Sequence, residues 1–206
     1  MIPIPIDLAV EDALSEAVAR QLLESCGKPY AIGTVYNRGG FGYLRKTING
    51  WNAAAKGKPF LVLTDLDDKP CPSSLIQDWL TAPKHENLLF RLAVREVEAW
   101  LLADAEGLSQ YLAVKRGILP NSPEDLPDPK GRLVQLASLS KRKQIREDIV
   151  PRKRSTAKTG PGYNICLSDF VRTKWDIAAA AAKAPSLRRT LHRLTAFRPS
   201  WDPPRR

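Results

Sequence analysis

The chain is poor in the residues that build disulfide frameworks and zinc sites, with three cysteines and two histidines among its 206 residues. Cys26, Cys71 and Cys166 are odd in number, far apart and not arranged as CxxC pairs. Disulfide-rich domains and structural zinc sites need paired or clustered ligands. We therefore expect reduced thiols in a cytoplasmic protein.

Long apolar runs are also absent. No stretch approaches the roughly 18 residues that a membrane-spanning helix needs, and residues 1–7 lack the basic region of a secretory signal. We therefore expect no membrane association. With 43% hydrophobic and 26% charged residues, the chain has a globular composition, and its length suits one main core with a smaller appendage.

Charge is divided unevenly along the chain. Residues 1–110 carry 11 Lys/Arg against 14 Asp/Glu, whereas residues 111–206 carry 21 against 8, so the net charges are −3 and +13. This division predicts carboxylates for a metal in the first half and cations for a polyanion in the second. A basic tail that only aids solubility, or that binds nucleic acid without specificity, remains an alternative.

The stretch FLVLTDLDD, residues 60–68, runs from apolar residues into three carboxylates. A continuous apolar run predicts a strand buried on both faces of a parallel sheet. Ligands of open α/β sheets bind just beyond the carboxyl ends of the strands, where Asp65, Asp67 and Asp68 would lie. This density of negative charge favours a bound Mg²⁺, although a strand followed by an Asp-rich turn remains open.

Carboxylates follow two other predicted strands. Glu11 comes directly after a strand at 4–10, and Glu96 and Glu98 follow a strand at 87–94. Because parallel strands present their carboxyl ends at one edge of a sheet, we expect these groups to lie together there. An all-oxygen set without nearby histidine suits Mg²⁺ or Mn²⁺ rather than zinc.

The other elements follow from helical periodicity and turn residues. We expect a further strand at 30–35, a glycine-rich loop at 37–42, and helices that begin at Asp12 and span 44–55 and 74–80. From about residue 107 the α/β alternation fades into helical, basic sequence. There, Asp128 is predicted to cap a helix that reaches about 139, Ser168 to cap a long helix, and residues 185 onward to form a last helix with a basic band.

We therefore predict an α/β core over residues 1–107, a mostly parallel Rossmann-like sheet flanked by helices. Residues 108–206 would form a helical, basic extension that binds nucleic acid or a partner.

The acidic pattern resembles that of the TOPRIM domain of topoisomerases, primases and overcoming-lysogenization-defect (OLD) type nucleases. It is most similar to small stand-alone TOPRIM-like proteins of bacterial defence operons. The matching segments are VEDALSE at 10–16, LTDLD at 63–67 and REVEAWLLAD at 95–104. One position departs from the pattern: the first Glu is usually followed by Gly, and here by Asp12, which adds another possible ligand.

This resemblance implies a Mg²⁺- or Mn²⁺-dependent nuclease that cuts DNA, with RNA as a second possibility. It also implies an anti-phage role beside an ABC/SMC-type ATPase. Asp65 and Asp67 would be primary ligands, Glu11 a ligand or general acid/base, and Glu96 and Glu98 a second metal site.

Cations are expected to hold the phosphates of the substrate. The candidates lie in the glycine-rich loop, beside the second acidic pair and in the basic segment near residue 155: Arg38, Arg95, Arg152, Lys153, Arg154 and Lys158.

Two alternatives stay open. The chain could be a non-catalytic nucleic-acid-binding subunit with a degenerate site. It could also be a haloacid-dehalogenase-type phosphatase, because the sequence DLDD at 65–68 resembles the nucleophile loop of that family.

Overall fold

The computed structural model describes residues 2–200, which form two compact units. Residues 2–92 together with 189–200 make the first, and residues 93–188 make the second. The predicted division at residue 107 differs from this one, because the last helix returns to the first unit and the second acidic pair belongs to the second.

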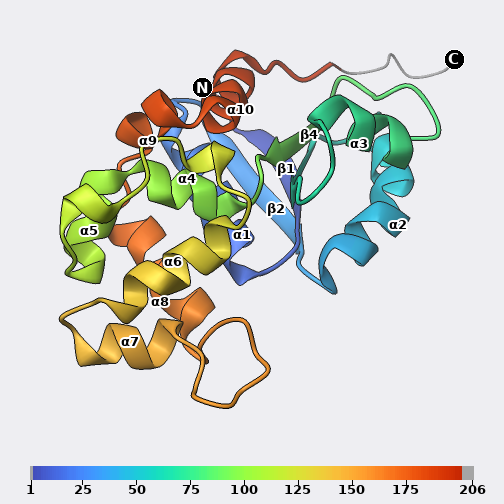
Figure 1. The fold of residues 1–206 in the computed structure, drawn as a ribbon. Helices are drawn as coiled ribbons and strands as arrows, with labels where there is room; N and C mark the ends of the chain where they lie inside the picture. The colour runs from blue at the N-terminus through green and yellow to red at the C-terminus, as the bar shows by residue number, and fades with distance from the viewer. Residues whose placement is uncertain (1, 201–206) are drawn as a thin grey trace, which may run out of the picture. The chain divides into compact units, whose positions relative to one another are not determined.

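A four-stranded parallel sheet organises the first unit (Figure 1). Its strands are β1 (Ile4–Val10), β2 (Tyr30–Tyr36), β3 (Phe60–Asp65) and β4 (Leu88–Ala93), in the order β2-β1-β3-β4. The prediction of an α/β fold with a parallel sheet is confirmed, and the arrangement is Rossmann-like. All six residues of β3 are buried, as its continuous apolar run predicts.

Helices connect the strands: α1 (Ala13–Ser25), α2 (Gly40–Ala54) and α3 (Pro72–Trp79). Strand order reverses after β1, since β2 lies on one side of it and β3 on the other. Right-handed crossovers then place α1 and α2 on opposite faces of the sheet. Helix α2 begins four residues earlier than the sequence predicted, so the glycine-rich loop is shorter than expected.

A buried carboxylate, Asp7, lies where the register between β1 and β2 shifts after Ile6. Asp7 accepts the backbone N–H of Thr34 at 2.7 Å and pairs with Lys58 Nζ at 2.5 Å. A Cβ on Gly33 would lie only 2.4 Å from the Asp7 carboxylate. Glycine is therefore required there by the close approach of the carboxylate.

Residues 189–197 pack against β2 within the first unit. The Tyr30 hydroxyl donates to the Leu194 carbonyl at 2.7 Å, and the ring of Tyr30 stacks on Phe197. The helix that carries Leu194 is α10 (Pro185–Ala196), which begins at the predicted proline. Its residues 189–196 belong to the first unit.

The second unit is helical. It contains α4 (Val97–Ala103), α5 (Ala105–Leu112), α6 (Pro129–Ser138), α7 (Lys143–Ile149), α8 (Tyr163–Thr173) and α9 (Ile177–Lys183), with short 3₁₀ turns at Arg116–Ile118 and Pro123–Asp125.

One predicted cap in this unit is right and another is wrong. Asp128 caps α6, since its Oδ1 accepts the Gly131 N–H at 2.7 Å. Ser168, however, lies buried inside α8, which begins at Tyr163. The predicted long helix is therefore two shorter ones, and the second is capped by Asp176, which accepts the Ala179 N–H at 2.9 Å.

Within residues 2–200, no helix combines the length and apolar character needed to cross a bilayer. Cys26, Cys71 and Cys166 are all free thiols.

Replacement of Ile6 by alanine tests the core. Ile6 is fully buried in β1, whereas Ile2 is 92% exposed. We expect Ile6→Ala to lower the free energy of unfolding of the first unit by about 2–5 kcal/mol, because a cavity is left in the sheet core. Ile2→Ala, the matched control, should change it by less than about 0.5 kcal/mol. Urea denaturation followed by circular dichroism measures both, and equal effects would contradict the described core.

Candidate functional site

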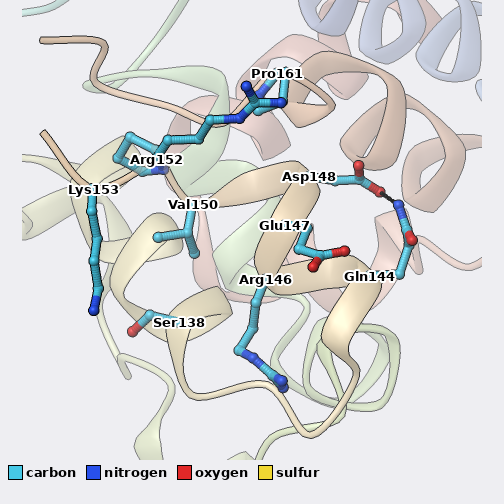
Figure 2. Close-up of a pocket in the computed structure, with 10 residues that line it drawn as sticks. Ser138, Gln144, Arg146, Glu147, Asp148, Val150, Arg152, Lys153 and Pro161 are labelled. Atoms are coloured by element: carbon cyan, nitrogen blue, oxygen red, sulfur yellow. Dashed lines mark hydrogen bonds between the residues drawn. The ribbon is translucent and has the colours of Figure 1, made fainter. Parts of the chain in front are cut away.

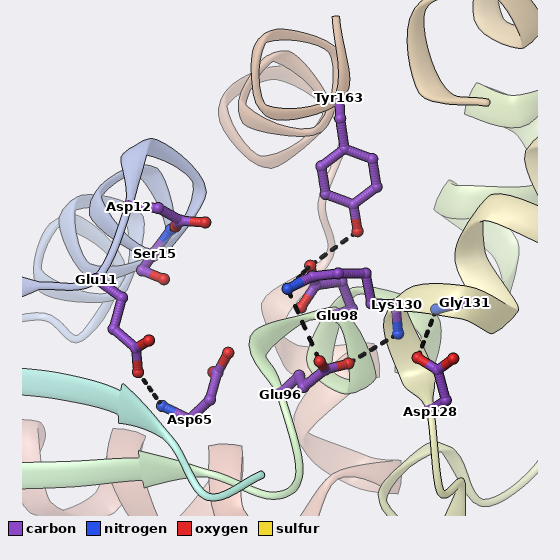
Figure 3. A network of polar contacts seen from close by, with 10 residues as sticks. All are labelled: Glu11, Asp12, Ser15, Asp65, Glu96, Glu98, Asp128, Lys130, Gly131 and Tyr163. Atoms are coloured by element: carbon purple, nitrogen blue, oxygen red, sulfur yellow. Dashed lines mark hydrogen bonds and ion pairs between the residues drawn. The ribbon is translucent and has the colours of Figure 1, made fainter. Parts of the chain in front are cut away.

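The first acidic group lies where β1 and β3 end side by side. Val10 is paired with Leu63, so Glu11 and Thr64 follow at the same level of the sheet. Glu11 Oε1 accepts a hydrogen bond from the Thr64 hydroxyl. It accepts another, of 2.8 Å, from the backbone N–H of Asp65 (Figure 3). Strand order reverses at β1 and β3, and such a switch point is where open α/β sheets form ligand sites.

Burial dominates the electrostatics of Glu11. It raises the pKa of the carboxyl above its ordinary value, and the hydrogen bonds from Thr64 and Asp65 oppose that rise. The negative charges of Asp67 and Asp12 raise the pKa further. Negative charge therefore accumulates around a carboxyl group that is held in a defined orientation.

The three aspartates at the end of β3 differ in exposure. Asp65 is 9% exposed at the end of β3, whereas Asp67 and Asp68 are exposed in the loop that follows. Asp67 has a positive φ of 49°, which turns the chain sharply just after the strand. The predicted ligands Glu11, Asp65 and Asp67 thus share one strand edge of the first unit.

Three acidic residues of the matching motifs have structural partners. Asp12 caps α1 by accepting the Ser15 N–H at 2.8 Å, and its φ of −151° is extended, so the site does not require the glycine that usually stands there. Glu16 binds Arg20 at 2.9 Å. Asp104 caps α5 and also accepts the Asp176 N–H at 2.9 Å.

The second acidic pair forms a hydrogen-bonded network inside the second unit. Glu96 accepts the Lys130 backbone N–H at 2.9 Å. Lys130 Nζ lies 3.7 Å from Glu96 Oε1 and 3.5 Å from Glu98 Oε1 (Figure 3). The Tyr163 hydroxyl donates to Glu98 Oε1 at 2.8 Å. An ammonium group thus lies between the two carboxylates predicted to bind a second metal ion.

Glu98 is the most buried acid of this network, with 1% of its surface exposed. Burial raises its pKa to about 7; the Lys130 ammonium opposes this rise and the Glu96 charge adds to it. Its Oε2 is buried, and no group among residues 2–200 forms a hydrogen bond with it. An orphaned buried oxygen of this kind has capacity for a further proton or cation.

The donors suit a hard metal ion in kind. They are carboxylate oxygens, which Mg²⁺ and Mn²⁺ prefer. In number the set is smaller than predicted, because the described residues contain no group of three or more His, Cys, Asp or Glu side chains arranged to hold a metal ion. Metal binding therefore stays a prediction.

The predicted phosphate contacts are divided between the units. Arg38 is exposed just before α2 in the first unit, and the other five lie in the second. Arg95 is half-buried before α4, whereas the remaining four occupy the exposed segment between α7 and α8: Arg152, Lys153, Arg154 and Lys158.

A cavity of about 760 Å³ lies beside this segment, within residues 138–161 (Figure 2). Arg146, Arg152 and Lys153 line it together with Glu147 and Asp148. Because both signs of charge line the cavity, it is less suited to a polyanion than the exposed segment itself.

Both acidic groups contact residues that the sequence analysis did not single out. Thr64 stands directly before Asp65 in the strand, where its hydroxyl could have been considered. Lys130 and Tyr163 are 34 and 65 residues from the glutamates that they contact, and no local pattern connects them.

No protein-family model, no curated protein and no solved structure matches this chain.

Replacement of Glu98 by glutamine tests the buried acid. With a pKa near 7 in the folded state against about 4.5 ordinarily, Glu98 keeps a proton that the unfolded chain has released between these pH values. The free energy of unfolding should therefore fall as pH rises from about 4.5 to 7 and level off above. We expect Glu98→Gln to flatten this fall.

Urea denaturation at several pH values in EDTA measures the effect. Glu106→Gln, at an exposed position of the same unit, is the control and should keep the wild-type profile. An unchanged fall in Glu98→Gln would contradict the assignment.

Proposed function

We propose that this protein hydrolyses phosphodiester bonds of nucleic acid, DNA above all, with a Mg²⁺ or Mn²⁺ ion held by Glu11, Asp65 and Asp67. The observation that carries this proposal is the pairing of Glu11 with the Thr64–Asp65 end of β3 at the switch point of the sheet. When bound, such an ion polarises the scissile phosphate and lowers the pKa of a water molecule.

The residues of the chain contribute orientation and proton transfer. Thr64 and the Asp65 N–H hold one oxygen of Glu11, which fixes the orientation of its carboxyl group. A Glu with a raised pKa exchanges protons closer to neutral pH than an ordinary one, which suits a general acid or base. Exposed cations between α7 and α8 would neutralise the phosphates of the substrate.

The cellular setting rests on the resemblance to TOPRIM-like defence proteins. We propose a cytoplasmic effector of an anti-phage system, with an ABC/SMC-type ATPase as partner.

The position of Lys130 favours a second candidate. Its ammonium already balances Glu96 and Glu98, as a structural ion pair would. In this candidate, Lys130 takes the place of a metal ion between Glu96 and Glu98, and the protein binds nucleic acid without cutting it.

Cleavage assays test the proposed hydrolysis. Plasmid and single-stranded substrates should be cut with Mg²⁺ or Mn²⁺ and not in EDTA. Asp65→Asn and Glu11→Gln should each lower the rate at least ~100-fold, because each replaces a carboxyl group of the proposed metal site by a neutral amide. Glu24→Gln, at an exposed position of α1, should cut like the wild type. Cleavage that survives both site variants would refute the assignment.

Metal-dependent thermal stability separates the two candidates. A ligand at 100 times its Kd stabilises the folded state by about 2.7 kcal/mol, which corresponds to a Tm increase of roughly 5–10 °C for a chain of this size. We expect this shift with Mn²⁺ for the wild type and not for Asp65→Asn. No shift in the wild type, together with nucleic-acid binding, would favour the non-catalytic candidate.

A further inference from the structure

Four cationic side chains meet on the first unit between β4 and α10. Arg91 lies in the middle of β4, Lys84 lies just before that strand, and Arg189 and Arg193 are four residues apart on α10. We call this group the β4–α10 cationic cluster. The separation of four places both α10 arginines on one face of the helix, about 6 Å apart along its axis.

Hydrogen bonds position the two residues that do not belong to the helix. Arg91 Nε donates to the Thr190 hydroxyl at 3.3 Å, so its guanidinium lies against α10. Lys84 Nζ donates to the carbonyl oxygens of Leu88 at 3.1 Å and His85 at 3.3 Å. Thr190 is buried, whereas Arg189 and Arg193 are exposed. The cluster therefore has a half-buried anchor, Arg91, beside an exposed cationic helix face.

The cations act on one another. Burial lowers the pKa of Arg91, and the charges of Arg189 and Arg193 lower it further. Burial of the ammonium group likewise lowers the pKa of Lys84, with further contributions from Arg193 and Arg91. The contributions of the arginines to these shifts are repulsions between positive charges that lie close together.

Among residues 2–200, acidic partners do not balance this repulsion. Within residues 2–200, no carboxylate forms an ion pair with any of the four cations, and Glu86 is the one acid that raises the pKa of Lys84. Elsewhere in the same unit Arg20 pairs with Glu16 and Arg45 with Asp78. Because these four positive charges repel one another, an anion that binds beside them would lower the free energy of the folded state.

We propose that the β4–α10 cationic cluster binds the phosphate backbone of nucleic acid. Guanidinium groups match phosphate oxygens with two parallel hydrogen bonds, which makes arginine the suited residue for this contact. Arg189 and Arg193 follow one another along one face of α10, and this spacing suits an extended polyanion better than one isolated anion.

The sequence of α10, PSLRRTLHRLTA, contains no Phe, Tyr or Trp, and the imidazole of His192 is its one ring on which a base could stack. Contacts to phosphates alone carry no base information, so this surface should bind without sequence preference. The inference shares with the proposed function the assumption of a nucleic-acid partner, but it does not depend on hydrolysis.

Fluorescence anisotropy with labelled single-stranded and duplex oligonucleotides in EDTA tests the surface. We expect Arg189→Gln combined with Arg193→Gln to raise the Kd at least ~10-fold at 0.1 M salt. The slope of log K against log salt should become shallower by about 2, because two phosphate contacts are lost. Arg45→Gln combined with Lys46→Gln removes the same charge from the exposed face of α2 and should raise the Kd less than ~2-fold.

Three outcomes would overturn the proposal: an unchanged Kd in the α10 variant, an equal loss in the α2 control, or displacement of the oligonucleotide by inorganic phosphate at the same phosphate concentration. If the protein cleaves DNA but the α10 variant binds it as tightly as the wild type, only this surface is rejected. Binding that depends on α10, without any cleavage, would reject only the nuclease.

Discussion

Two hydrogen bonds to Glu11, from the Thr64 hydroxyl and the Asp65 N–H, join the carboxyl ends of β1 and β3. The position of the Glu11 carboxyl group in the candidate site depends on them. They orient a carboxyl group that burial would otherwise favour as a neutral acid. Because the strand order reverses at these two strands, the oriented carboxyl lies where an α/β sheet leaves room for a ligand. Changes in either strand would disturb both the fold and the site.

The two units differ in whether their charged groups have partners of opposite charge. In the second unit the Lys130 ammonium forms ion pairs with Glu96 and Glu98, and the Tyr163 hydroxyl donates a hydrogen bond to Glu98. The negative charge of these two glutamates is therefore balanced within the unit. In the first unit the β4–α10 cationic cluster holds positive charges that lie close together, and within residues 2–200 no carboxylate forms an ion pair with them. Such an unbalanced group favours an external anion such as the phosphates of nucleic acid.

The sequence predicted the sheet well because its signals are local. Residues 60–65 form a strand buried on both faces, and Asp12 and Asp128 cap helices as their positions indicate. Ser168 was wrong as a cap because its neighbours Leu167 and Phe170 are buried in the second unit, and this packing extends the helix back to Tyr163. Helix propensity alone does not distinguish a cap from an interior serine in that context.

The sequence by itself determined the α/β class, the parallel sheet and the acidic ends of its strands, since strand periodicity and strand termini are properties of neighbouring residues. Only the tertiary structure decided which charges meet. It brought Lys130 and Tyr163 to the glutamates from 34 and 65 residues away, and Arg91 to α10 across 99. Burial and long-range pairing come from packing, and packing determines whether a carboxylate is solvated, neutralised or held ready for a cation.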